Sequence, residues 1–215
     1  MDMDVPVKTA LIWGAGGGIG QATARRLMSE GWRVLAAGRH TDSLSDQPEH
    51  LFEVELGDAF SVQSAVTAIS QAVSEVDLWV YAAGDIASLR VGDMQPRDWQ
   101  RLMDANLGGA FLATHYSLPL LAEHSHLFYI GAVSERMRLP GLAAYAAAKA
   151  GLEAMAEVVR KESRRKVTVV RPGAVDTAFW EKVPFKLPPH HLAPDQVAAR
   201  ILQAYTEEQQ GILDI

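Results

Sequence analysis

The chain of 215 residues contains no cysteine. This absence excludes disulfide bonds, cysteine-ligated zinc and thiol catalysis. No uninterrupted apolar run reaches the roughly 20 residues that a membrane-spanning helix needs. Acidic residues outnumber basic ones, so the formal net charge is −6. A negative net charge disfavours nucleic acids and anionic membranes as partners. What is present, 48% hydrophobic and 21% charged residues, is the composition of a soluble globular protein.

The amino-terminal segment Met1-Asp-Met-Asp-Val-Pro6 carries acidic residues where a secretory signal carries basic ones. The length fits one domain, and no internal repeat, low-complexity tract or linker divides the chain. We therefore expect a cytoplasmic protein with a single domain over residues 1–215. Within it, the proline-rich stretch at residues 180–192 predicts a surface loop next to a substrate.

Short apolar segments alternate with segments of helical periodicity along the chain. Strands that are apolar throughout and alternate with helices predict a parallel sheet that is covered on both faces. Right-handed crossovers then give a doubly wound sheet, which binds its ligands at the carboxyl ends of the strands. We predict strands at residues 8–13, 32–37, 51–56, 76–83, 127–130, 166–171 and 211–215, and helices at 20–29, 59–73, 97–123 and from Tyr145 to about 165.

A glycine cluster, Gly14-Ala-Gly16-Gly17-Gly18-Ile-Gly20, separates the first strand from the first helix. Glycines allow a tight turn and let a pyrophosphate approach the backbone, where the amides of the helix amino-terminus face it. Any glycine cluster can be only a flexible turn, but this one stands between a strand and a helix, as the motif requires. The fold class we expect is therefore α/β, a single Rossmann-type sheet of about seven strands with helices on both faces. The residues predicted to hold the dinucleotide are Gly14, Gly16, Gly17, Gly18, Ile19 and Gly20.

The second strand ends at Gly38-Arg39, without a carboxylate. Sheets that bind NAD usually place an acidic residue here for the ribose 2′-hydroxyl, whereas a basic residue accommodates a 2′-phosphate. A guanidinium can bind phosphate in fork geometry, so Arg39 favours NADP over NAD as the cofactor. The alternative is that Arg39 is an exposed loop arginine without this role.

Tyr145 and Lys149 are four residues apart in an alanine-rich run that follows Pro140-Gly141. On a helix they lie on one face, one turn apart. An ammonium next to a phenol stabilises the phenolate and lowers the tyrosine pKa, which lets the hydroxyl exchange a proton near neutral pH. Such a pair on its own is usually an exposed helix face, but the glycine cluster in the same chain favours the chemical interpretation.

Taken together, these features resemble the short-chain dehydrogenase/reductase family over nearly the whole chain. The spacing Gly14-x-x-x-Gly18-x-Gly20 and the pair Tyr145-x-x-x-Lys149 are similar to the two signatures of that family. The resemblance implies hydride transfer between NADP and a small carbonyl or alcohol substrate, with Tyr145 as proton donor or acceptor. It also implies that Lys149 holds the nicotinamide ribose and that Asn106 supports Lys149 through a water.

Further parts of the chain resemble the family's cofactor site. The pair Glu55-Leu56 is similar to the residues that flank adenine in that family. The run from Arg171 to Thr177 is similar to the segment that wraps the nicotinamide. The family also implies a homodimer or homotetramer that buries the Asn106 and Tyr145 helices. The remaining cofactor-binding residues implied by the resemblance are Glu55, Leu56, Ala83, Gly84, Pro172, Gly173, Val175 and Thr177.

The chain departs from the family pattern at three places. Trp13 replaces the usual threonine before the first glycine, and Tyr81-Ala-Ala-Gly84 replaces Asn-Asn-Ala-Gly, so backbone contacts or packing must hold loop and sheet. At the position of the serine that binds the substrate carbonyl stands Ala132, with Ser134 two residues on. We expect Ser134 to take the serine's place if the strand end is bulged. If Ser134 does not reach the substrate, the loss of this hydrogen-bond donor lowers the rate on the order of 100-fold.

Two other classes of function remain open. A non-catalytic NADP-binding sensor or scaffold is compatible with Ala132, and an isomerase or epimerase would return the hydride to the same substrate. The seven histidines have no metal-ligand spacing and are expected in loops and at helix ends, so no metal is predicted. Phe179 and Trp180 are expected to face the pocket and suggest a small, partly apolar ligand, but the sequence does not identify the substrate.

Overall fold

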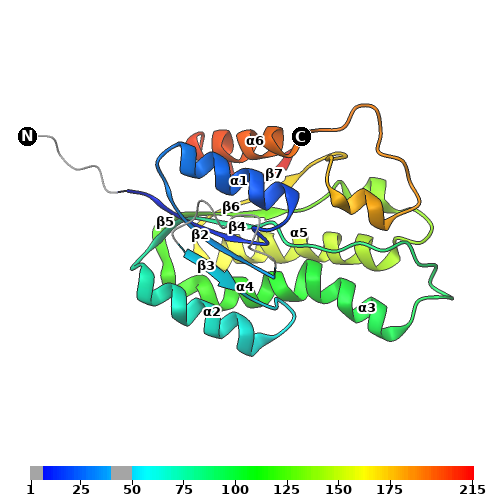
Figure 1. The fold of residues 1–215 in the computed structure, drawn as a ribbon, viewed down its shortest axis with the longest axis horizontal. Coiled ribbons are helices and arrows are strands. Elements are labelled where there is room, and N and C mark those ends of the chain that lie inside the picture. Colours follow the sequence, from blue (N-terminus) through cyan, green and yellow to red (C-terminus); the bar gives the residue numbers. More distant parts are fainter. Residues whose placement is uncertain (1–6, 40–49) are drawn as a thin grey trace, which may run out of the picture.

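The computed structural model describes residues 7–39 and 50–215. Within these ranges seven strands form one sheet in the order β3-β2-β1-β4-β5-β6-β7, and every neighbouring pair is parallel. Figure 1 shows the sheet between two layers of helices. The predicted α/β class and doubly wound parallel sheet are confirmed. The strands are β1 (Thr9–Trp13), β2 (Arg33–Gly38), β3 (His50–Glu53), β4 (Val76–Tyr81), β5 (Leu121–Ile130), β6 (Lys166–Arg171) and β7 (Gly211–Asp214).

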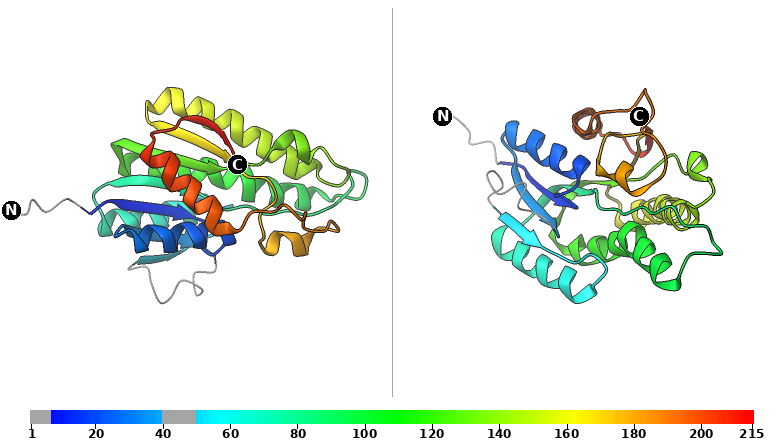
Figure 2. Two further views of the ribbon diagram at one scale, coloured as in Figure 1. Left: turned by 90° about the horizontal axis from the view of Figure 1, so that it is seen from above. Right: turned by 45° about the vertical axis from the view of Figure 1, so that its right-hand side comes forward.

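The two layers of helices enclose two separate parts of the core. Helices α1 (Gly18–Ser29) and α6 (Pro194–Thr206) pack against each other on one face of the sheet. The other face is covered by α2 (Ala59–Ala72), α4 (Gly109–Ser117) and α5 (Ala143–Ser163), with α3 (Pro96–Met103) beside α5. Figure 2 shows α1 and α6 in front when the molecule is seen from above, and the two layers again after a turn of 45°.

The central strand β1 is almost wholly apolar, and both of its faces are buried. All five residues of β1 are buried. Leu11 and Trp13 belong to the core under α2, α4 and α5, whereas Ala10 and Ile12 belong to the core under α1 and α6. This alternation follows from the two-residue period of a strand. It explains why the sequence shows continuous apolar runs and not the alternation of a half-exposed sheet.

The predicted helical region over residues 97–123 is confirmed, but it contains a π-helical turn and ends at Leu120. Helix α3 stops at Met103, a π-helical turn covers Asp104–Gly108, and α4 follows; a 3-10 turn, Leu118–Leu120, ends the helical region. Strand β5 then begins at Leu121, six residues before the predicted strand at 127. The pairing of β4 with β5 shifts in register between Val76 and Leu78. The residues of β5 directly after Ala122 are polar, so no apolar pattern in the sequence marks this part as a strand.

Helix α6 was not predicted. It begins with Pro194 at its first position, where a proline fits because its missing N–H has no helical partner there. Its buried side chains, which include Val197 and Ile201, pack against α1. The prolines of the preceding loop concealed this helix start in the sequence.

The histidine prediction is wrong for three residues, because His50 lies in strand β3 and His124 and His126 lie in strand β5. His124 Nε2 is 2.9 Å from Asp77 Oδ1, and the buried His126 Nε2 is 2.8 Å from Thr168 Oγ1. Burial lowers the pKa of His126 to about 4, so its ring is neutral at physiological pH. Among the described residues no group of three or more histidine and carboxylate side chains forms a metal site. In that part of the chain no helix is long and apolar enough to cross a membrane.

Candidate functional site

A cavity of about 1320 Å³ lies at the carboxyl ends of the central strands. It extends from the glycine loop after β1 to the segment that follows β6. Single-ligand pockets commonly measure about 300–1,000 Å³. This cavity therefore has room for two ligands side by side, and the loops after the parallel strands form its walls as expected for a doubly wound sheet.

The glycine loop is held by backbone contacts. The N–H groups of Gly14 and Ala15 donate to the Ala37 carbonyl at 2.7 and 3.1 Å, and the Ala82 N–H donates to the Trp13 carbonyl at 2.8 Å. Gly14 has a φ of 81°, and a Cβ there would lie 2.4 Å from the Ala83 nitrogen. Only glycine fits this approach of β1 and β4. These contacts replace the side-chain hydrogen bonds that the family's threonine and asparagine would supply.

The predicted glycine residues divide into two groups. Gly14, Gly16, Gly17, Gly18 and Ile19 line the cavity, and the first turn of α1 directs backbone amides toward it. Gly20 does not line the cavity. A Cβ on Gly20 would lie 2.3 Å from the Gly14 carbonyl oxygen, so this glycine lets α1 approach the loop and does not face a ligand.

The opposite wall near β2 and β3 carries the residues expected around adenosine. Arg39 at the end of β2 lines the cavity, as do Glu55, Leu56 and Asp104. The hydroxyl of Ser61 accepts a 2.9 Å hydrogen bond from the Glu55 N–H and fixes this turn. The structure thus brings the predicted Arg39, Glu55 and Leu56 to one end of the cavity.

Tyr145 and Lys149 lie on the first turns of α5 at the other end of the cavity. Both side chains are buried, with exposed fractions of 8% and 3%. Lys149 Nζ is 5.7 Å from the centre of the Tyr145 ring and donates a 2.8 Å hydrogen bond to the Ile130 carbonyl. The helical spacing therefore brings the two groups together as predicted, and Lys149 also ties α5 to the end of β5.

The electrostatics of this pair differ from the expectation. Burial lowers the pKa of Lys149 to about 8. Burial also raises the pKa of Tyr145, whereas the sequence predicted that the neighbouring cation lowers it. The cause is the loss of hydration on burial, which disfavours the phenolate. The phenol is therefore protonated over the whole physiological range of pH.

Asn106 lies in the π-helical turn behind the cavity wall and is fully buried. Its Nδ2 donates to the carbonyls of Asp85 and Leu102 at 2.6 and 2.8 Å. No described residue donates to its Oδ1. A Cβ on Gly84 would lie 2.8 Å from this oxygen and 3.7 Å from Lys149 Nζ. Gly84 therefore lies between the Asn106 amide and the Lys149 ammonium, where there is no space for a side chain. Asn106 does not itself line the cavity.

The segment after β6 folds over the glycine loop. Pro172, Gly173, Val175 and Thr177 all line the cavity. A Cβ on Gly18 would lie 2.6 Å from Thr177 Cγ2, which shows how closely the segment approaches α1. The predicted nicotinamide segment is therefore next to the predicted phosphate loop.

The following 3-10 turn, Ala178–Lys182, carries two of the predicted pocket aromatics. Phe179 and Trp180 line the cavity. Phe179 contacts Tyr145 edge-on with ring centres 6.4 Å apart, and Trp180 Nε1 donates to the Val175 carbonyl at 2.8 Å. Figure 1 shows this segment in orange beside the first turns of α5.

Ala132 and Ser134 follow β5. Ala132 is buried and packs with Ile86, Leu142 and Tyr145, so an apolar methyl stands where the family has a hydroxyl. Ser134 begins the 3-10 turn Ser134–Met137, and its side chain lies outside what the structure describes. Its predicted contact with the substrate carbonyl stays a prediction.

A buried carboxylate that the sequence analysis did not identify joins three elements across the cavity. Asp85, directly after Gly84, forms ion pairs with Arg101 of α3 and with Lys182, whose Nζ is 2.7 Å from Asp85 Oδ1. Lys182 lies 97 positions away from Asp85. All three line the cavity. Burial lowers the pKa of Lys182, and the charges of Arg39 and Arg101 lower it further. The three cations are therefore close enough to interact. Local sequence patterns carry no signal for such a contact.

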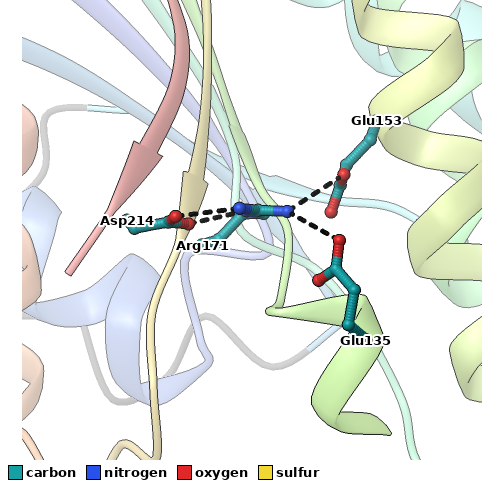
Figure 3. A network of polar contacts seen from close by, with 4 residues as sticks. All are labelled: Glu135, Glu153, Arg171 and Asp214. Atoms are coloured by element: carbon teal, nitrogen blue, oxygen red, sulfur yellow. Dashed lines mark hydrogen bonds and ion pairs between the residues drawn. The ribbon is translucent and has the colours of Figure 1, made fainter. Parts of the chain in front are cut away.

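A second ion-pair network stabilises the back of the site (Figure 3). Arg171 at the end of β6 binds Asp214 of β7 with two hydrogen bonds of 2.6 and 2.8 Å. Its Nη1 is also 3.5 Å from Glu135 and 3.5 Å from Glu153 of α5. Burial raises the pKa of Glu153. The network joins the turn after β5 to the strand that leads into Pro172, and so it fixes two walls of the cavity relative to each other.

Comparison with known proteins agrees with this architecture. The model of the family described as short chain dehydrogenase matches residues 8–186. The chain is 28% identical to an uncharacterised oxidoreductase of Staphylococcus aureus over 93% of this chain and 91% of that protein. It is also 28% identical to one of Staphylococcus epidermidis, over 84% of each. The chain therefore belongs to the short-chain dehydrogenase family of oxidoreductases.

Solved structures share the fold at low sequence identity. An aldohexose dehydrogenase of Thermoplasma acidophilum aligns with a TM-score of 0.85 and 18% identity, over 99% of this chain and 93% of that one. An alcohol dehydrogenase of the archaeon Thermococcus sibiricus, complexed with 5-hydroxy-NADP, aligns with a TM-score of 0.87 and 22% identity, over 98% and 95%. These likenesses establish the fold and do not identify a substrate.

Proposed function

We propose that this chain is an NADP-dependent oxidoreductase that interconverts a carbonyl and an alcohol, with Tyr145 as the proton donor and acceptor. The observation that carries the proposal is the position of two predicted sites in one cavity. The glycine loop and Arg39 line one part of it, and the buried Tyr145 and Lys149 line another. This arrangement suits a long cofactor that reaches from one part to the other.

The residues present fit a dinucleotide. The first turn of α1 offers backbone amides to phosphate, and its glycines leave the space that a Cβ would fill. Thr177 and Val175 supply the opposite wall. When bound, NADPH supplies the hydride for the reduction of the carbonyl carbon.

The protein's own part in the reaction is the transfer of a proton. Because burial raises its pKa, Tyr145 carries its proton at neutral pH and donates it to the alkoxide that develops on the substrate. The nearby Lys149 stabilises the phenolate that forms, and its pKa of about 8 leaves most of it charged at pH 7. Asn106 acts as a positioning residue behind Gly84, with its Oδ1 on the side of the Lys149 ammonium.

The preference for NADP over NAD rests on Arg39. Its guanidinium lines the adenosine end of the cavity, where Gly38 provides no carboxylate for a ribose hydroxyl. The substitution Arg39→Asp is expected to weaken NADPH binding by about 10-fold to 100-fold and to leave NADH binding unchanged or tighter. Titration of both cofactors by nucleotide fluorescence measures this, and equal loss for both would contradict the preference.

A panel of aldehydes and ketones tests the proposed activity. The wild-type protein is expected to oxidise NADPH with at least one of them, whereas Tyr145→Phe binds NADPH but does not turn over. Tight NADPH binding without turnover of any carbonyl would instead support the alternative of a non-catalytic sensor or scaffold.

The proposal includes a homodimer or homotetramer in the cytoplasm. Exposed apolar side chains on α3, α4 and α5 support the association: Trp99, Phe111 and Val158 are 40%, 54% and 50% exposed. Light scattering after size exclusion measures the mass. Phe111→Asp is expected to shift the equilibrium toward the monomer, and a monomeric wild type would contradict this part of the proposal.

A further inference from the structure

The wall of the cavity next to Tyr145 is a separate apolar cluster. Six apolar side chains pack around the phenol ring, apart from the two clusters that form the core of the sheet. All of them line the cavity. We call them the apolar subsite; its members are Ile86, Ala132, Met137, Leu142, Phe179 and Val183.

The apolar subsite is assembled from distant parts of the chain. Ile86 follows β4, Ala132 and Met137 follow β5, and Leu142 precedes α5. Phe179 and Val183 come from the segment after β6. These members and Tyr145 all line the cavity, and Met137, Phe179 and Val183 are only partly buried. The cluster therefore has the properties of a ligand-binding surface.

Two cations lie beside the subsite. Lys182 Nζ, 6.0 Å from the centre of the Phe179 ring, is paired with Asp85. Arg136, the neighbour of Met137, also lines the cavity, and its charge contributes to the low pKa of Asp214. Among the six members of the subsite no side chain carries a hydroxyl, amide or charge.

We infer that the substrate presents an aromatic or branched aliphatic group to this subsite, next to its carbonyl. The inference rests on the proposed carbonyl–alcohol activity and adds the class of substrate. An apolar group gains from leaving water against these side chains. A polyhydroxylated substrate such as a sugar would leave hydroxyls unpaired there, and one such hydroxyl in an apolar pocket costs about 100-fold.

Kinetics with matched aldehydes test the inference. With NADPH, kcat/KM for benzaldehyde and cyclohexanecarboxaldehyde is expected to exceed that for glyceraldehyde by about 100-fold or more. The inference is overturned if glyceraldehyde or an aldohexose is reduced as efficiently as the apolar aldehydes.

Two near-isosteric substitutions test the assignment of the subsite. Met137→Gln with Val183→Thr is expected to lower the preference for benzaldehyde over glyceraldehyde at least 10-fold without changing the Kd of NADPH. The control Val91→Thr places the same hydroxyl on an exposed residue outside the cavity and leaves the preference unchanged. An unchanged preference in the double variant would overturn the assignment.

A binding measurement separates this inference from the proposed activity. Saturation-transfer NMR on the complex with NADP⁺ compares benzyl alcohol with glycerol. Stronger binding of benzyl alcohol, lost in the double variant, supports the apolar subsite even if no aldehyde is reduced, in which case the proposed activity alone fails. Binding of neither alcohol, or stronger binding of glycerol, overturns the inference.

Discussion

Lys149 Nζ lies 5.7 Å from the centre of the Tyr145 ring, and its 2.8 Å hydrogen bond goes to the Ile130 carbonyl. The ammonium is thus buried with one backbone acceptor and an aromatic ring next to it. Burial of this charge lowers the Lys149 pKa to about 8. The protein therefore keeps a cation in the site at a cost in folding free energy, which has measurable consequences.

The first consequence is a dependence of stability on pH. Between pH 8 and 10.5 the unfolded chain binds a proton at Lys149 that the folded protein has lost, so the free energy of unfolding rises with pH over this window. Below pH 8 the full penalty is present, on the order of 3 kcal/mol. Urea unfolding of wild type and Lys149→Met at pH 7.5 and 9.5 measures the difference. The rise should be smaller in Lys149→Met; equal slopes would contradict the buried charge.

The ion pairs of Asp85 predict unequal effects of two substitutions. Asp85→Asn removes the buried carboxylate from two half-exposed cations, Arg101 and Lys182, and should lower the free energy of unfolding by about 1–2 kcal/mol. Lys182→Met removes a half-exposed partner, while Arg101 remains paired, and should cost less than about 1 kcal/mol. Chemical denaturation of both variants tests the order, and a larger loss in Lys182→Met would contradict it.

The glycine loop predicts that two alanine substitutions have different outcomes. Gly14→Ala combines a positive φ with a contact of 2.4 Å to the Ala83 nitrogen and should destabilise the fold by about 3 kcal/mol or more. Gly17→Ala meets only the Gly14 carbonyl oxygen, at 3.4 Å, and should cost about 1 kcal/mol or less. Its methyl group nevertheless faces the space for phosphate, so the Kd of NADPH should rise at least 10-fold. A folded Gly17→Ala that binds NADPH as tightly as wild type would refute this function of the loop.

The Arg171 network predicts opposite effects for substitutions of its two partly buried members, Arg171 and Glu153. Arg171→Met leaves Asp214 and Glu153 without their cation and should lower the free energy of unfolding by about 2–4 kcal/mol. Since burial raises the pKa of Glu153, its charge opposes folding above its ordinary pKa, and Glu153→Gln should be neutral or slightly stabilising at pH 7. Thermal unfolding at pH 7 measures both; a marked loss in Glu153→Gln would show that its charge is needed.

Features encoded within a few neighbouring residues could be predicted from the sequence. The apolar runs predicted the strands, the spacing of Gly14 to Gly20 predicted the loop, and the helical period predicted that Tyr145 and Lys149 meet. The structure also brings Arg39, Glu55 and Thr177 to one cavity, as the resemblance implied.

Features that depend on contacts between distant residues were not predicted. The pairing of Asp85 with Lys182 has no local pattern, and the burial of His126 depends on its partner Thr168 in the next strand. The direction of the Tyr145 pKa was wrong because the sequence shows the neighbouring cation but not the loss of hydration. The π-helical turn after Met103 was not predicted because such a turn keeps the helical pattern of side chains nearly intact.

The most direct test of the account is the turnover of wild type and Tyr145→Phe with NADPH and an apolar aldehyde. Loss of a general acid should lower kcat about 100-fold to 10,000-fold. The Kd of NADPH should change less than threefold, because the variant keeps Lys149 and the glycine loop. Retention of more than a tenth of the wild-type kcat by Tyr145→Phe would contradict the assignment of Tyr145 as the proton donor.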